Sequence, residues 1–117
     1  MFINLTNHPT AGWSEEQMKA ARQYGEIVDI GFPIIEPSYT KDDIMRCVKV
    51  YVELIKGIMD GETVVHVMGE MTFTHNMVNA LKETGIICLA STTERNTVIT
   101  TDGKKISEFK FVQFREY

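Results

Sequence analysis

The segment TVVHVM, residues 63–68, restricts the fold more than any other part of this chain. It is rich in β-branched residues and almost unbroken in its apolar character, as expected for a strand that is covered on both faces of a sheet. The segment IICLA, residues 86–90, has the same character. Residues 1–5 and 26–32 are further apolar stretches, each followed by turn-forming residues. The sequence therefore predicts four short strands, two of which are buried inside a parallel sheet.

Helical patterns separate these strands. A capping-box pattern opens a helix predicted over 14–25. A second helix, predicted over 40–60, has apolar residues that recur at steps of three and four. Thr72 or Thr74 is expected to cap a third helix, which runs to about Glu83. Each predicted helix therefore connects one predicted strand to the next.

The alternation of strands and helices predicts one Rossmann-like, three-layer α/β domain over residues 1–117, with a mainly parallel sheet and helices on both faces. We expect the strand order 2-1-3-4. Residues 97–117 predict a β-hairpin that turns at Asp102-Gly103 and is added at one edge of the sheet. The apolar alternation in its second arm shifts by one residue, which predicts either a bulge near Phe111 or burial on both faces. The polar segment 91–96, STTERN, is interpreted as a turn.

The composition narrows the classes of function. A net charge of −4 offers no basic surface for long nucleic acid. No apolar run approaches the roughly 20 residues that cross a bilayer, and the start of the chain lacks a signal-peptide pattern. We therefore expect no membrane contact and a cytoplasmic location. Cys47 and Cys88 are interpreted as small buried hydrophobic residues, and the spacing of the three histidines indicates neither a metal site nor a cofactor.

Polar turns follow three of the predicted strands. They are Thr6-Asn7-His8, the segment 69–75, and Ser91-Thr92-Thr93-Glu94-Arg95. The carboxyl ends of parallel strands meet at one edge of a sheet, and ligands of open α/β sheets bind there. The opposite edge carries only simple helix stops. This asymmetry predicts a binding site at the carboxyl edge.

Residues of the middle turn also have structural explanations. One of Thr72 and Thr74 can cap the helix while the other binds a ligand, and the free N–H groups of the helix N-terminus attract anions. Gly69 either relieves a tight turn or lets a ligand approach the backbone. Glu70 would repel a phosphate if ionised, so it fits a polar contact or the role of a base better than the binding of an anion. The turn therefore predicts ligand binding without fixing the charge of the ligand.

The histidines, the single tryptophan and one arginine each carry two interpretations. His75 is either a solvated residue of the first helical turn or a general acid or base. His8 is either an exposed loop residue or catalytic, and His66 is interpreted as a core histidine. Arg95 is either a surface charge or a ligand for a phosphate oxygen. Trp13 either covers the end of the sheet or stacks on a nucleobase.

Four segments resemble a known family. NLTNHPT, VMGEMTFTH, ASTTER and FKFVQFREY are similar to the small, single-domain CRISPR-associated Rossmann-like proteins of type III systems, which are related to the CARF sensor domains. Several members of that family are ring nucleases. The resemblance covers most of the chain in layout.

The resemblance implies a homodimer that binds cyclic oligoadenylate, a second messenger, and cleaves it without a metal or other cofactor. In ring nucleases the ribose 2′-hydroxyl attacks the neighbouring phosphate and leaves a 2′,3′-cyclic end. By their location, His75, Arg95 and His8 are the candidate catalytic residues. The candidate ligand-binding residues are Thr6, Asn7, Gly69, Glu70, Met71, Thr72, Thr74, Ser91, Thr92 and Thr93. The alternative is a non-enzymatic protein that binds nucleotides or uses its hairpin to bind a partner.

Overall fold

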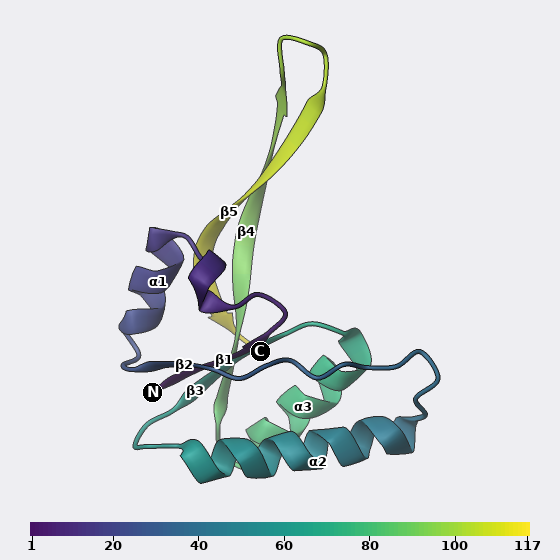
Figure 1. The fold of residues 1–117 in the computed structure, drawn as a ribbon. Helices are drawn as coiled ribbons and strands as arrows, with labels where there is room; N and C mark the ends of the chain where they lie inside the picture. Colours follow the sequence, from purple (N-terminus) through teal and green to yellow (C-terminus); the bar gives the residue numbers. More distant parts are fainter.

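A computed structural model describes residues 1–117 and places five strands in one mixed sheet, in the order β2-β1-β3-β4-β5 (Figure 1). The strands are β1 (Phe2–Thr6), β2 (Ile27–Asp29), β3 (Val64–Met68), β4 (Ile87–Ile99) and β5 (Lys105–Glu116). The first four strands pair in parallel, and β5 pairs antiparallel with β4. The predicted order 2-1-3-4, with a hairpin added at the edge, is confirmed.

Helices cover both faces of the sheet, but unequally. The long helices α2 (Lys41–Ile58) and α3 (Met71–Glu83) lie together on one face (Figure 1). Their apolar stripes bury the main core against alternate residues of β1, β3 and β4. The other face carries only the short α1 (Glu15–Arg22) and the single turn η1 (Thr10–Gly12). None of the helices combines the length and apolar character required to span a membrane.

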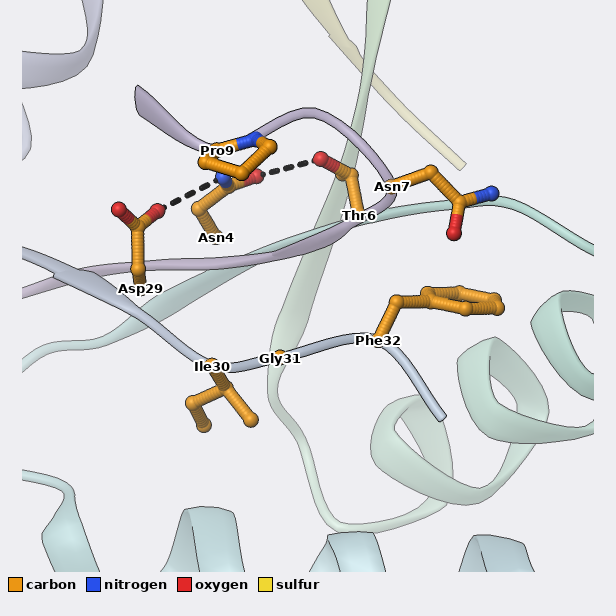
Figure 2. A pocket seen from close by; sticks show the side chains of 8 residues that line it. All are labelled: Asn4, Thr6, Asn7, Pro9, Asp29, Ile30, Gly31 and Phe32. Atoms are coloured by element: carbon orange, nitrogen blue, oxygen red, sulfur yellow. Dashed lines mark hydrogen bonds between the residues drawn. The ribbon is translucent and has the colours of Figure 1, made fainter. Parts of the chain in front are cut away.

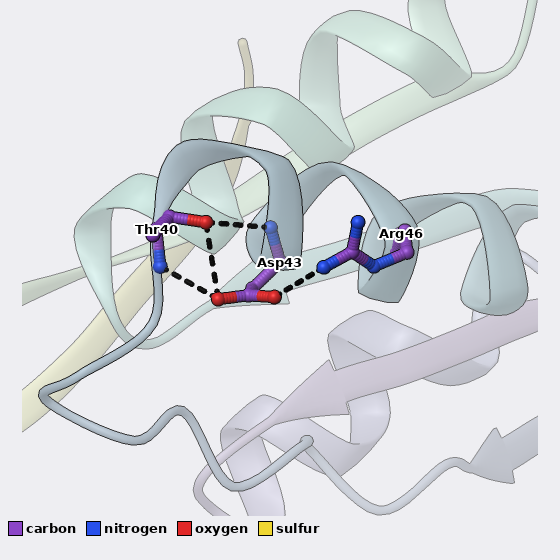
Figure 3. A network of polar contacts seen from close by, with 3 residues as sticks. All are labelled: Thr40, Asp43 and Arg46. Atoms are coloured by element: carbon purple, nitrogen blue, oxygen red, sulfur yellow. Dashed lines mark hydrogen bonds and ion pairs between the residues drawn. The ribbon is translucent and has the colours of Figure 1, made fainter.

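The start of α2 shows how local sequence sets an element boundary. Thr40 is the N-cap, and its hydroxyl accepts a hydrogen bond from the backbone N–H of Asp43. The Asp43 carboxylate in turn accepts from the Thr40 backbone N–H, which completes a capping box, and it also pairs with Arg46 (Figure 3). The second helix was predicted over 40–60, and its predicted start at residue 40 is confirmed.

The start of α3 differs from the prediction. Its N-cap is Glu70, whose carboxylate accepts hydrogen bonds from the backbone N–H groups of Thr72 and Phe73. The Thr72 hydroxyl donates to the same carboxylate. The prediction that Thr72 or Thr74 caps this helix is therefore wrong. The carboxylate of Glu70, two residues before Thr72, reaches these N–H groups and brings a favourable charge to the positive end of the helix.

The C-terminal hairpin is longer than predicted. β4 and β5 run as a two-stranded ribbon that projects well beyond the rest of the molecule (Figure 1), whose extents are 51 × 37 × 22 Å. The predicted turn at Asp102-Gly103 is confirmed, with Gly103 at a φ of 81°. The predicted bulge is confirmed as well, because the register shifts between Thr92 and Thr93. The prediction of a turn over 91–96 is wrong, since these residues continue β4.

Candidate functional site

The carboxyl ends of the central strands do converge at one edge of the sheet. Thr6 at the end of β1 lies beside Met68 at the end of β3. Ser91, in the neighbouring β4, donates its hydroxyl to the Met68 sulfur at 3.1 Å. The edge does not form one pocket, however. It carries two separate hollows, which we call the first and the second hollow.

The first hollow has a volume of about 210 Å³ and lies above the ends of β1 and β2 (Figure 2). It is lined by Asn4, Thr6, Asn7, Pro9, Asp29, Ile30, Gly31 and Phe32. Most of its polar groups are already occupied within the protein. Asn4 donates to the Asp29 carboxylate at 2.9 Å, and the other oxygen of that carboxylate accepts from the Thr10 hydroxyl at 2.7 Å. The first hollow therefore has few free donors for a ligand.

A buried polar network extends from the first hollow into the sheet. The Asn4 side-chain oxygen accepts a hydrogen bond from the Thr6 hydroxyl and lies 3.0 Å from Nδ1 of His66. This oxygen can only accept, so Nδ1 carries the proton and Nε2 has none. Nε2 is buried and has no partner. Burial of the imidazole, with a smaller contribution from the charge of His8, lowers the pKa of His66 from 6.5 to about 4.

Aromatic rings enclose this histidine on the α1 face. The rings of Phe2, Trp13 and Phe114 have centroids 5.8, 5.5 and 5.1 Å from that of His66. The Trp13 indole N–H donates to the His8 backbone oxygen at 3.0 Å. Trp13 therefore covers the sheet, as one of its two interpretations predicted. His66 is buried as predicted, although only one of its ring nitrogens is satisfied.

The second hollow, of about 470 Å³, lies between the end of β3 and the exposed side of α3. It is lined by Met68, Gly69, Met71, Thr74, His75, Val78, Asn79, Lys82 and Tyr117. Its volume falls within the roughly 300–1,000 Å³ of typical ligand sites. Lys82 and His75 give it cationic and proton-transfer groups, and it contains no carboxylate side chain. The second hollow is therefore suited to a small anionic ligand with an apolar part.

Two contacts position the polar groups of the second hollow. The Asn79 amide nitrogen lies 3.2 Å from Nε2 of His75, one helical turn away. Lys82 donates to the main-chain oxygen of Tyr117 at 3.3 Å. The Thr74 hydroxyl is buried and has no hydrogen-bond partner within the protein. Buried hydroxyls nearly always have a partner, so the unpaired Thr74 hydroxyl is a donor that reaches a ligand in the hollow only after a rotation about its χ1 angle.

Phe32 separates the two hollows. Its ring lines the first hollow and packs edge-on against Phe73, with centroids 5.2 Å apart and planes at 79°. Gly69, which lines the second hollow, lies directly beneath that ring: a Cβ atom at this position would be 2.3 Å from Cζ of Phe32. The glycine is therefore required for close packing by the phenylalanine. Close packing by Phe32, rather than the approach of a ligand to the backbone, therefore explains the glycine at this position.

The substitution Gly69→Ala is expected to lower the free energy of unfolding by about 1–2 kcal/mol. The added methyl group forces the Phe32 ring to turn away from Phe73. Urea unfolding measures the change. Gly12→Ala is the matched control, since a Cβ there meets nothing within 4 Å. Equal stability of both variants would contradict the proposed packing role of Gly69.

The predicted site residues fall into three groups. Thr6 and Asn7 line the first hollow, and Gly69, Met71, Thr74 and His75 line the second. The residues that line neither hollow are His8, Glu70, Thr72, Ser91, Thr92, Thr93 and Arg95. The residues of the predicted single site are therefore divided between two hollows at this edge. The second hollow holds more of the predicted residues.

Glu70 changes the electrostatics of the α3 N-terminus. Its hydrogen bond from the Phe73 backbone, followed by that from the Thr72 hydroxyl, lowers the pKa of this carboxyl below its usual value of 4.5. Glu70 is therefore ionised at neutral pH and occupies the N–H groups that an anion would use. The expectation that this helix N-terminus offers free N–H groups to a ligand is wrong.

Arg95 and its neighbours lie on the projecting ribbon, away from both hollows. The Arg95 guanidinium donates to the Ser107 hydroxyl at 3.2 Å and lies 5.9 Å from the centre of the Phe109 ring. Thr92 makes hydrogen bonds with the backbone of Gln113 at the bulge. These residues stabilise the ribbon in a single copy of the chain.

Sequence reasoning missed three polar residues of the second hollow: Asn79, Lys82 and Tyr117. The first two follow His75 by four and seven residues, so they lie on the same face of a helix. That spacing is a signal that the sequence contains. Tyr117 had no such signal, because it reaches the second hollow only through the pairing of β5 with β4.

The fold and the two hollows define this molecule as an α/β protein with a mixed sheet and two separate hollows at the carboxyl edge of its parallel strands. Three or more His, Cys, Asp or Glu side chains nowhere gather closely enough to hold a metal ion. Residues 1–115 match the family described as "Uncharacterized protein MJ1673 family", and the chain belongs to that family. Among curated proteins and solved structures, no significant match was found.

Proposed function

We propose that this protein binds cyclic oligoadenylate at the second hollow and cleaves it as a metal-independent ring nuclease, which would end type III CRISPR signalling in the cytoplasm. The observation that carries the proposal is the arrangement of Thr74, His75 and Lys82 on one face of α3, around a space that no carboxylate side chain lines. A hydroxyl without a partner and an ammonium group can bind a phosphodiester, and an imidazole can transfer a proton during its cleavage. The proposal includes a Rossmann-like assignment for the parallel half of the sheet.

Lys82 and Thr74 would hold the phosphate. An ammonium group attracts the non-bridging oxygens, and its charge offsets the negative charge that grows on them during the reaction. Once its χ1 angle rotates toward the hollow, the Thr74 hydroxyl can donate to one of these oxygens, because it has no partner in the protein. The apolar side chains of Met71 and Val78 line the same space and can contact an adenine ring. One nucleotide unit at a time fits a hollow of this volume.

His75 would move the proton. Its Nε2 lies 3.2 Å from the Asn79 amide, which fixes the ring. Nδ1 can act as a base only when Nε2 carries the ring proton, and this requires the Asn79 amide to turn so that its oxygen faces Nε2. Nδ1 accepts the proton of the ribose 2′-hydroxyl while the O2′–P bond forms and the P–O5′ bond breaks. The O5′ leaving group takes up a proton from the solvent, and His75 afterwards releases its proton to the solvent. The products are a 2′,3′-cyclic phosphate and a 5′-hydroxyl, and no water is consumed in this step.

The decisive experiment incubates the purified protein with cyclic tetra-adenylate or cyclic hexa-adenylate in the presence of EDTA. Chromatography and mass spectrometry are expected to show linear products that carry a 2′,3′-cyclic phosphate. Calorimetric titration of the same rings separates binding from cleavage. Linear tetra-adenylate with a 3′-phosphate is the control for recognition of the closed ring. Rings that remain intact and unbound would contradict the proposal.

A binding protein without catalysis is the second candidate function. The observation that favours it is the Asn79 amide nitrogen 3.2 Å from Nε2 of His75, because an Nε2 that accepts from this donor leaves the ring proton on Nδ1 and no base for the 2′-hydroxyl. In that case calorimetry detects binding and chromatography recovers the intact ring. A thermal-shift screen of mononucleotides and dinucleotides would then identify the preferred ligand.

A further inference from the structure

We infer that β5 pairs in antiparallel orientation with the β5 of a second copy, in a register centred on Phe109. β5 is the last strand of the sheet, and no element of the chain pairs with its outer edge. This edge is twelve residues long. Long, unpaired edges recruit other strands unless the sequence blocks them. The inference concerns the ribbon and holds whether or not the second hollow binds a ligand.

The hydrogen-bonding pattern of the ribbon identifies which groups are free. Thr100 donates its N–H to the Lys104 oxygen, so these two residues form a hydrogen-bonded pair. Hydrogen-bonded and open pairs alternate along an antiparallel ladder. In the ribbon between the tip and the bulge, Ser107 and Phe109 therefore direct their N–H and C=O groups away from β4. They are free to bond with another strand.

Several side chains of β5 are both apolar and exposed to solvent. Phe109 is 69% exposed, and Val112 and Ile106 are about half exposed. Lysines on an edge strand normally discourage pairing, and β5 carries Lys105 and Lys110. A lysine loses that effect when a carboxylate lies opposite it in the second strand. The register decides whether this happens.

Pairing centred on Phe109 makes the charges complementary. Glu108 then lies opposite Lys110 of the partner subunit, and by symmetry Lys110 lies opposite the partner's Glu108. Centring on Glu108 would place Glu108 opposite the partner's Glu108. Centring on Lys110 would place Lys110 opposite the partner's Lys110. The same register sets Phe109 against the partner's Phe109, at the two-fold axis, and Ile106 against the partner's Val112. Charge complementarity and apolar contact therefore favour one register and one occupant, a second copy of this chain.

This arrangement would extend each ribbon along the body of the other subunit. Because the strands are antiparallel, the tip of one ribbon, with Lys104, points toward the Tyr117 end of the partner's β5. Tyr117 lines the second hollow. The pairing therefore joins two sheets into one and brings the basic tip of each copy toward the hollow of the other.

Cross-linking tests the register directly. The Cα atoms of a hydrogen-bonded antiparallel pair are about 5.5 Å apart, which suits a disulfide. In a Cys47→Ser background, mild oxidation is expected to convert the Phe109→Cys variant into a covalent dimer. Thr97→Cys is the matched control, since Thr97 lies on β4, opposite Ser107 of its own chain. A cross-link at residue 97 but not at residue 109 would overturn the proposal.

Charge reversal gives a second, independent test by analytical ultracentrifugation. The Glu108→Lys variant sets two like-charged pairs across the axis, and the dissociation constant of the dimer is expected to rise by about tenfold. Adding Lys110→Glu to this variant is expected to restore most of the affinity. A chain that remains monomeric at its highest soluble concentration would overturn the proposal. So would a dimer that Glu108→Lys leaves unchanged.

Discussion

Acidification from about pH 7.5 to about pH 5 is expected to lower the free energy of unfolding by about 2 kcal/mol, and continuing to about pH 4 raises the loss to about 3 kcal/mol. The source is His66, whose pKa is about 4 in the fold and 6.5 without it. In this window the unfolded chain binds a proton at His66 and the folded chain does not. The stabilisation is therefore complete above pH 6.5 and is lost as the pH falls toward 4.

The surroundings of His66 explain why protonation is opposed. Its Nε2 is buried among aromatic rings, without an acceptor for a second proton. Its Nδ1 is already bonded to the Asn4 oxygen. A charged imidazole would have to be desolvated there with one N–H unpaired, and this cost opposes protonation. The charge of the nearby His8 adds to it.

Urea unfolding at a series of pH values measures this loss, and His66→Leu is the variant that removes it. The leucine variant is expected to have a nearly flat stability between about pH 7 and about pH 5. The carboxyl groups whose pKa the fold lowers are Glu70, Asp43 and Asp102. Their usual values are 4.5, 3.8 and 3.8, so they take effect only below this window. Parallel curves for the two proteins would contradict the assignment to His66.

Much of the fold could be predicted because its signals are local. The apolar period of α2 and the capping residues Thr40 and Asp43 fix that helix without reference to the rest of the chain. The β-branched character of β3 identifies a buried central strand. The one-residue shift in the alternation of β5 identifies the bulge. Each of these features depends on a few neighbouring residues.

The errors arose where distant residues decide the structure. The segment 91–96 is polar, which is typical of turns but equally of a strand in an exposed ribbon. It is extended here because β5, about twenty residues later in the chain, pairs with it. This pairing carries Arg95 away from the carboxyl edge and leaves only Ser91 beside β3. Composition alone could not distinguish the two outcomes.

The candidate site was predicted at the correct edge but not in the correct form. Topology placed the strand ends together, since that follows from the order of the strands. Whether their side chains share one space depends on Phe32, which fills the region above Gly69 and divides it. Phe32 lies in the loop after β2, which the sequence analysis did not include in the site. The division into two hollows is therefore a result of packing that no motif indicated.

Replacement of His75 with Ala is expected to slow ring opening by about 100-fold, while the dissociation constant for cyclic tetra-adenylate changes by no more than about twofold. The reason is that His75 would act on the 2′-hydroxyl proton and Lys82 and Thr74 would hold the phosphate. Single-turnover rates, measured with enzyme in excess, separate the two effects. Asn79→Ala is expected to cause a smaller decrease, because Asn79 only orients the imidazole through its contact with Nε2.

His8→Ala is the comparison that decides between the two candidate histidines. The His8 side chain is exposed and lines neither hollow. Its backbone oxygen accepts from Asn4, Thr6 and Trp13, and its backbone N–H donates to the Thr6 hydroxyl. Its replacement is expected to leave the rate of ring opening close to that of the unaltered protein. If His8→Ala abolished cleavage and His75→Ala did not, the reaction would take place above β1 rather than on α3. The first hollow would then be the active site, and the free donors of the second would need another ligand.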